Sequence, residues 1–191
     1  MAEFIAEYGL IILVALKDTL VMVVLSTGFG YLLGIPLGIV AYVTDHGSIS
    51  ENAAVNALAG WIINIVRYIP FIILILFLIP YTRFVMGTAS GTRGVIFPLV
   101  ISAAPFIARM VESSFNELDI GVIESAKAMG ATNLQIIWKV LLPESFPSLL
   151  RGMAIATITI IGYIAMAGMV GGGGLGAVAI NYGYYRYERP V

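Results

Sequence analysis

The sequence contains no cysteine and few charged residues. Its 191 residues include 10 Lys and Arg and 11 Asp and Glu, so charged residues make up 11% and the net charge is −1. The absence of cysteine excludes disulfides, thiolate metal ligands and thiol nucleophiles. A net charge near zero gives no electrostatic attraction to nucleic acid, so no nucleic-acid partner is expected. Soluble domains average about 25% charged residues, and much of this chain is therefore expected to face lipid.

Motifs of nucleotide chemistry and metal binding are also lacking. No G-x-x-x-x-G-K-[ST] loop is present, because the glycine run Gly171–Gly174 is not followed by lysine, and we interpret this run as a flexible turn. His46 is the single histidine, lies beside Asp45, and cannot build a metal site alone. No catalytic residue, metal site or cofactor is therefore expected within this chain.

Long apolar stretches are abundant instead. Hydrophobic residues make up 60% of the chain, and the mean hydropathy is +0.98. Crossing the hydrocarbon layer takes about 20 apolar helical residues. The sequence predicts an all-α, polytopic transmembrane helix bundle in a single domain, residues 1–191, with four spans at about 19–43, 57–81, 94–110 and 152–170. A shorter apolar stretch, Leu10–Leu16, is expected either to lie at the membrane interface or to extend the first span.

Glycine, proline and arginine occur within the predicted spans. Gly30, Gly34 and Gly38 come at every fourth residue and share one helix face, which favours close packing against another helix; a flexible helix is the alternative. Pro70 is expected to be tolerated in the second span, because neighbouring helices can satisfy the freed backbone. Arg67 is a functional candidate if it lies within that span. If the span starts after Arg67, its side chain simply reaches the membrane surface.

A polar segment from Arg109 to Arg151, the polar loop, separates the third and fourth spans. Arg109 and Glu112 have the i, i+3 spacing of a helical ion pair, which favours a structural anchor. Asp119 can cap a short helix, and Gly130 stands where a helix ends in the left-handed conformation that glycine adopts at little cost. The pattern predicts a short helix that ends in a tight glycine turn.

A second short helix is predicted directly after this turn. Thr132 and Gln135 have the spacing of a capping box, which marks a helix start. Pro143 and Pro147 are expected to bound this helix, because proline cannot continue a helix interior. Its apolar face is expected to consist of Ile136, Ile137, Val140 and Leu141. The polar loop is therefore predicted to form a helix–turn–helix at a membrane surface.

The polar loop resembles the "EAA" motif of ATP-binding-cassette importer permeases. The shared residues are Glu124-Ser125-Ala126, Gly130, Ile137 and Leu142-Pro143, with Ser125 in place of the first alanine of the family pattern. In that family the loop is cytoplasmic and docks onto a separate ATPase, an orientation that the loop charges alone do not decide. The resemblance implies a type I importer permease with a coupling loop over about residues 111–148. The coupling residues it implies are Glu124, Ser125, Ala126, Gly130, Ala131, Leu142 and Pro143.

Further stretches resemble the permeases of bacterial methionine importers, from about residue 17 to residue 187. The similar stretches are residues 69–74, 104–112, 128–132, 162–168 and 171–176, followed by Tyr182-Gly-Tyr184. The resemblance implies a homodimer in the inner membrane that binds two copies of an ATPase, which holds the ATP and magnesium, and receives D- or L-methionine from an extracytoplasmic substrate-binding lipoprotein. Such permeases continue through a fifth span; in this sequence four spans are expected up to Val191, and the usual fifth is expected to be missing.

Tyr163, Met166 and Met169 are candidates for lining a translocation pathway in the fourth span. A thioether is soft and adaptable, which suits a path for an apolar amino acid, and the resemblance implies that this helix lines the passage. Ordinary apolar packing of these side chains is the alternative interpretation.

Three other functions are weighed against a methionine importer subunit. One is an importer permease for another amino acid or small solute. A second is a transporter driven by an ion gradient, which predicts acids buried within spans and often an internal repeat. The acids of this chain lie in loops and near the termini and no repeat is found, which disfavours that function. The third is a membrane scaffold or sensor that only docks a cytoplasmic partner.

Overall fold

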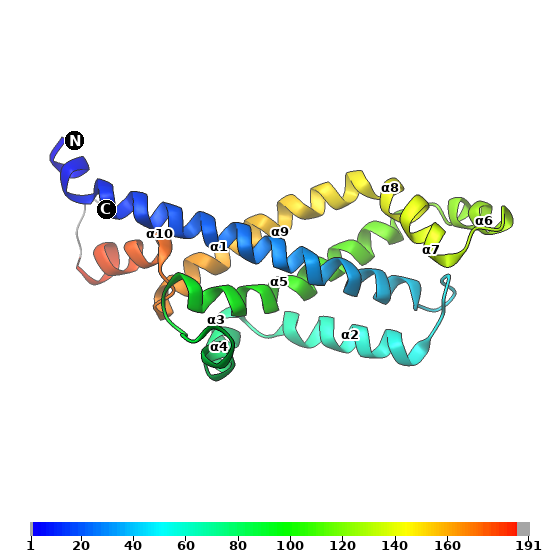
Figure 1. The fold of residues 1–191 in the computed structure, drawn as a ribbon, viewed down its shortest axis with the longest axis horizontal. Helices are drawn as coiled ribbons and strands as arrows, with labels where there is room; N and C mark the ends of the chain where they lie inside the picture. The colour runs from blue at the N-terminus through cyan, green and yellow to red at the C-terminus, as the bar shows by residue number, and fades with distance from the viewer. Residues whose placement is uncertain (1, 187–191) are drawn as a thin grey trace. The chain divides into compact units, whose positions relative to one another are not determined.

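The computed structural model describes residues 2–186, with the side chains of residues 8–186, and no strand occurs in this range (Figure 1). The predicted all-α class is confirmed. In chain order the elements are α1 (Ala2–Val43), α2 (Ala53–Tyr68), α3 (Phe71–Phe77), α4 (Ile79–Met86), α5 (Gly91–Asn116), α6 (Ile120–Ala128), α7 (Asn133–Ile136), η1 (Ile137–Leu141), α8 (Leu142–Glu144), α9 (Phe146–Ala167), η2 (Gly168–Val170), α10 (Gly174–Val178) and η3 (Ala179–Tyr185).

Three helical segments of the described chain are long and apolar enough to cross a membrane. They are Tyr8–Val43, Gly91–Asn116 and Phe146–Val170, and the bent pair of α2 and α3 gives a fourth if it counts as one span. Each of the three contains one predicted span and is longer than predicted. The first is longer because α1 runs without interruption through Lys17 and Asp18. The apolar stretch Leu10–Leu16 therefore extends the first helix.

The second predicted span, 57–81, is not one continuous helix. α2 ends at Tyr68, and α3 begins only at Phe71. Pro70 stands at the N-cap of α3 with φ −54° and ψ 134°, outside the helical region. Proline disfavours the helical conformation at the residue before it and lacks the N–H that a helix interior needs. The expectation that this span absorbs Pro70 is wrong, and Arg67 lies exposed in the last turn of α2.

The contacts within the chain group into two compact units, where the sequence predicts a single domain. In the described range, unit 1 contains the residues up to Phe29, Ile69–Ser102 and the residues from Thr157 onwards. Unit 2 contains Gly30–Tyr68 and Ala103–Ala156. The helices α1, α5 and α9 each contribute to both units, and the polar loop belongs wholly to unit 2.

In unit 1 the glycine run forms a turn that is packed on both sides. Gly173 and Gly174 have positive φ angles of 77° and 70°, which side chains rarely tolerate. The N–H of Leu175 donates to Thr19 Oγ1 at 2.9 Å, and a Cβ on Gly172 would lie 2.6 Å from the carbonyl oxygen of Ala167. The run is therefore the predicted turn, but α1 and α9 hold it in place. From this turn α10 returns beside the first part of α1 (Figure 1).

In unit 2 the glycine stripe of α1 packs directly on α5. A Cβ on Gly34 would lie 2.7 Å from the carbonyl oxygen of Ala104, and a Cβ on Gly38 would lie 2.8 Å from Val111 Cβ. Both distances are too short for a real side chain, so the packing interpretation of the stripe is confirmed. α2 joins the same core, which contains the buried residues Ala41, Ala59, Ile63 and Ala108.

Candidate functional site

The polar loop begins with the predicted short helix and glycine turn. Asp119 is the N-cap of α6, and its Oδ1 accepts a hydrogen bond from the N–H of Gly121 at 2.8 Å. Gly130 has a φ of 80°, and its N–H donates to the carbonyl of Lys127 at 2.9 Å. The N–H of Ala131 reaches back to the carbonyl of Ala126 at 3.1 Å. These two hydrogen bonds form a Schellman motif, which ends α6 and reverses the chain.

The second short helix starts at the predicted capping box. Thr132 Oγ1 accepts from the N–H of Gln135 at 3.3 Å, while Gln135 Oε1 accepts from the N–H of Thr132 at 2.9 Å. After α7 the chain widens into the π-helix η1, where the N–H of Leu142 donates to the carbonyl of Ile137. The wider turn brings residues five apart onto a common face. The least exposed residues of this stretch are the predicted set, Ile136, Ile137, Val140 and Leu141.

The two prolines do not end the helical path. Pro143 lies in the first turn of α8 and Pro147 in the first turn of α9, so the chain continues to turn as a helix through both. A proline costs little in a first turn, because its missing N–H would have no partner there. Each proline therefore stands at the start of a helix, and the expectation that the two prolines bound an isolated second helix is wrong.

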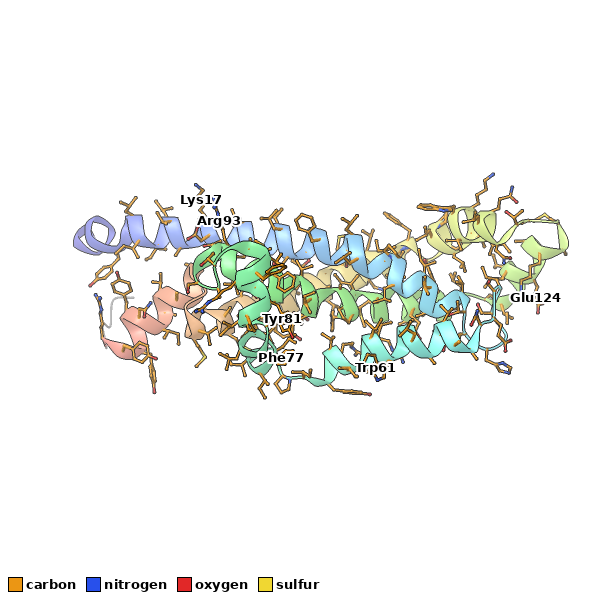
Figure 2. The ribbon with its side chains drawn as sticks, turned by 60° about the horizontal axis from the view of Figure 1, so that its bottom comes forward. Lys17, Trp61, Phe77, Tyr81, Arg93 and Glu124 are labelled. Atoms are coloured by element: carbon orange, nitrogen blue, oxygen red, sulfur yellow. The ribbon has the colours of Figure 1, made fainter. Side chains whose placement is uncertain are left out.

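The predicted coupling residues lie on α6, in the glycine turn after it and at the start of α8, beyond the ends of α5 and α9 in unit 2 (Figure 1). Figure 2 shows Glu124 on α6. The side chain of Ala126 is buried. Ala131 and Leu142 are half-buried, and the exposed residues are Glu124, Ser125, Gly130 and Pro143.

The same segment carries exposed apolar side chains that were not predicted from the sequence. Met129 is 82% exposed, and Leu134 and Trp138 are also exposed, although they sit on the most polar part of the chain. Leu134 and Trp138 are four residues apart and face away from the buried Ile136. Their spacing is the sequence signal that could have revealed a second apolar face.

Two hollows flank α6. One, of about 450 Å³, lies at the glycine turn and is lined by residues that include Ala126, Gly130 and Lys139. The other, of about 210 Å³, is lined by Glu124 and Lys127 of α6 and by Asp45 and His46 from the connection between α1 and α2. The α1–α2 connection and the polar loop therefore lie at the same end of unit 2, and both are expected on one side of the membrane.

The α1–α2 connection carries an exposed ion pair. His46 Nδ1 lies 2.8 Å from Glu51 Oε1, and the N–H of Gly47 donates to Glu51 Oε2 at 2.9 Å. The hydrogen bond with Glu51 and the charge of that carboxylate raise the pKa of His46. The Gly47 N–H and then the bond to His46 lower the pKa of Glu51. In the described part of the chain, no group of three His, Asp or Glu residues could hold a metal ion.

The pair gives a pH-dependent connection. Folding raises the pKa of His46, so the contribution of His46 to the stability of the fold is present below the ordinary pKa of about 6.5. This contribution is lost as the pH rises through the pKa of the folded state. Because the pKa of Glu51 is lowered, its contribution disappears only at acidic pH, as the carboxylate protonates. We expect an NMR titration of His46 to give a midpoint above the ordinary value and Glu51→Gln to lower that midpoint. An unchanged midpoint in the variant would remove the pair as the cause.

The candidate pathway residues belong to unit 1, whereas the coupling residues belong to unit 2. Tyr163 of α9 stacks on Phe71 of α3, with ring centroids 4.7 Å apart and planes at 8°. Met166 lies on α9, Met169 lies in η2, and both side chains are exposed. The stacking sets the orientation of the Tyr163 ring.

Comparisons with known proteins extend over nearly the whole chain. Residues 34–186 match the family described as binding-protein-dependent transport system inner membrane component. The chain is 45% identical to the probable D-methionine transport system permease protein MetI of Vibrio cholerae, over 100% of this chain and 85% of that protein. It is 48% identical to the corresponding probable protein of Pasteurella multocida, over 88% of this chain and 78% of that protein.

Solved structures are similar as well. A chain of the inward-facing MetNI methionine ABC transporter superposes with a TM-score of 0.88 at 48% identity, covering 90% of this chain and 80% of that one. A chain of an amino acid ABC transporter with histidines superposes with a TM-score of 0.78 over 97% of this chain and 85% of that one. At 19% identity, the second similarity concerns the fold alone.

Proposed function

Because the chain belongs to the family of binding-protein-dependent transport system inner membrane components, we propose that it is the membrane-spanning permease subunit of an ATP-driven methionine importer. The observation that carries the proposal is the 45% identity, along this entire chain, to a probable D-methionine permease. The helix–turn–helix of the polar loop supports it independently, since an importer driven by a separate ATPase needs a rigid element outside the membrane. A carrier driven by an ion gradient has no need of such an element.

The coupling element is proposed to be the segment formed by α6, α7 and the start of α8. The Schellman turn at Gly130 and the capping box after it make the segment stiff enough to transmit a displacement. Met129, Leu134 and Trp138 supply exposed apolar area that a partner protein would cover. The coupling residues are proposed to be Glu124, Ser125, Ala126, Gly130, Ala131, Leu142 and Pro143.

The energy source is proposed to lie in partner chains. Two copies of an ATPase would bind ATP and magnesium, and their approach on ATP binding would displace the coupling segment of each permease copy. The displacement would favour one of two states of the helix bundle, since a partner shifts an equilibrium only through contacts that differ between the states. The complete importer is proposed to contain a second copy of this chain in the lipid bilayer and an extracytoplasmic substrate-binding lipoprotein that delivers methionine.

The passage for methionine is proposed to follow α9 past Tyr163, Met166 and Met169. Thioether side chains adapt to an apolar ligand of variable shape, and both methionines are exposed. Tyr163 is oriented by its stacking on Phe71 and would offer a fixed aromatic surface beside them.

Uptake by whole cells tests the proposed substrate. Cells that lack their own methionine importer would produce this chain together with its ATPase and binding protein. We expect them to take up labelled D- or L-methionine. Excess unlabelled methionine should suppress this uptake, and the same concentration of glutamine should not. Equal suppression by glutamine would indicate a permease for a different amino acid, and the absence of any uptake would contradict the proposal.

A further inference from the structure

The coupling segment leaves the helix bundle through two arms, the end of α5 and the start of α9. Glu117 directly follows the last residue of α5. Its Oε2 accepts a hydrogen bond from Ser148 Oγ of α9 at 2.7 Å. The same oxygen lies 3.4 Å from Arg151 Nη2, one turn further along α9. One carboxylate therefore connects two arms that are separated by about thirty residues of chain.

A second ion pair on the same arm provides a natural comparison. Arg109 Nη1 lies 2.6 Å from Glu112 Oε1, but both residues belong to α5 and are three positions apart. This pair is the predicted helical anchor, and it connects α5 only to itself. Both carboxylates are paired with an arginine, but Glu112 joins two residues of α5, whereas Glu117 joins the end of α5 to α9.

We propose that Glu117 is a positioning residue that holds the two arms together, so that a displacement of the coupling segment moves α5 and α9 as one rigid unit. The inference rests on the proposed function, because it concerns how the segment passes on a displacement. A push applied at α6 and α7 can either move both helices or spread the arms apart. Every contact that resists spreading sends more of the displacement into the helices.

The expected effect is modest because the contact is exposed. The side chains of Arg151 and Glu117 are 69% and 55% exposed, and an exposed pair changes an equilibrium by about two- to fivefold. Loss of the contact should therefore weaken coupling without preventing the complex from forming. The quantity to measure is the number of methionine molecules taken up per ATP hydrolysed.

The first test uses the complete complex in vesicles. We expect Glu117→Ala to lower the uptake per ATP about two- to fivefold, whereas Glu112→Ala leaves this ratio at the wild-type value. Exchanging the charges, with Glu117→Arg and Arg151→Glu in one chain, should restore part of the ratio. An equal loss in Glu117→Ala and Glu112→Ala, or no loss in either, would overturn the proposal.

The second test does not depend on transport. Because the chain has no cysteine, spin labels can be attached to single cysteines introduced at the exposed positions Ser113 of α5 and Leu150 of α9. We expect the distance distribution between the labels to broaden in Glu117→Ala and to stay unchanged in Glu112→Ala. An unchanged width in Glu117→Ala would contradict the positioning role. If the wild-type complex took up no methionine, the proposed function would fail, and the label distances would still decide whether Glu117 holds the arms.

Discussion

Replacing Gly34 with leucine should lower the free energy of unfolding by about 3 kcal/mol. The Cβ of any residue at this position would lie 2.7 Å from the carbonyl oxygen of Ala104 and 2.8 Å from Ile107 Cβ. A backbone oxygen cannot move aside as the end of a side chain can, so α1 would have to separate from α5. The separation would open the core of unit 2. Thermal unfolding of the purified chain in detergent measures the loss.

Gly28 provides the matched control in the same helix. Apart from the adjacent backbone of α1, no atom lies within 4 Å of a Cβ built at Gly28. The Gly28→Leu variant changes the backbone flexibility of α1 in the same way and adds the same side chain, but without a clash. We expect it to unfold at or above the wild-type temperature, since leucine favours helices by about 0.8 kcal/mol over glycine. Equal destabilisation by the two variants would show that glycine at these positions matters for flexibility rather than for packing.

Replacing Gly130 with valine should uncouple ATP hydrolysis from transport. Gly130 has a φ of 80°, where a β-branched residue is strained, and no atom lies within 4 Å of its Cβ position. The variant therefore acts only through the backbone, at a cost of about 1–2 kcal/mol, which lowers the ratio of formed to unformed turn about tenfold. We expect methionine uptake per ATP hydrolysed to fall, while the assembled complex continues to hydrolyse ATP.

Asparagine at the same position distinguishes backbone strain in the turn from the effect of adding a side chain. It also adds a side chain to Gly130, but it tolerates the left-handed conformation far better than valine does. Gly130→Asn should keep most of the uptake. Normal coupled uptake in Gly130→Val would refute the role of the turn, and equal loss in both variants would assign the effect to the added side chain.

The helix–turn–helix of the polar loop was predictable because its signals are local. The cap at Asp119, the turn at Gly130 and the capping box of Thr132 and Gln135 each involve residues a few positions apart, and the structure contains all of them. Local hydrogen bonds depend little on the rest of the molecule. The apolar face followed for the same reason, since periodicity within one helix decides which side is buried.

The break near Pro70 was not predicted, because the length of an apolar stretch does not reveal whether one helix continues through it. The stretch 57–81 is apolar enough for one span, and proline is tolerated in many membrane helices. Whether the helix continues depends on the residue before the proline, and here α2 has already ended at Tyr68. The same limit applies to Pro143, where the wider turn of η1 precedes a new helix start, and to Pro147 in the first turn of α9.

Contacts between distant residues were beyond the sequence analysis. The glycine run was predicted as a turn, but Thr19, which binds the N–H of Leu175, lies 156 residues away in the chain. The hydrogen bond between Ser148 and Glu117 likewise joins residues that are far apart in the chain. Neither pair has a spacing that a sequence pattern could reveal, because only the packing of the helices brings the partners together.

Reconstituted vesicles test the central claim, that a partner ATPase drives this permease through the polar loop. The vesicles would contain this chain with its ATPase, the binding protein would be on the substrate side, and ATP would be on the side of the polar loop. We expect methionine to accumulate with ATP and without any proton or sodium gradient. Accumulation should stop when the ATPase carries a substitution of its phosphate-binding lysine. Uptake driven by an ion gradient in the absence of ATP, or no uptake by the intact complex, would contradict the claim.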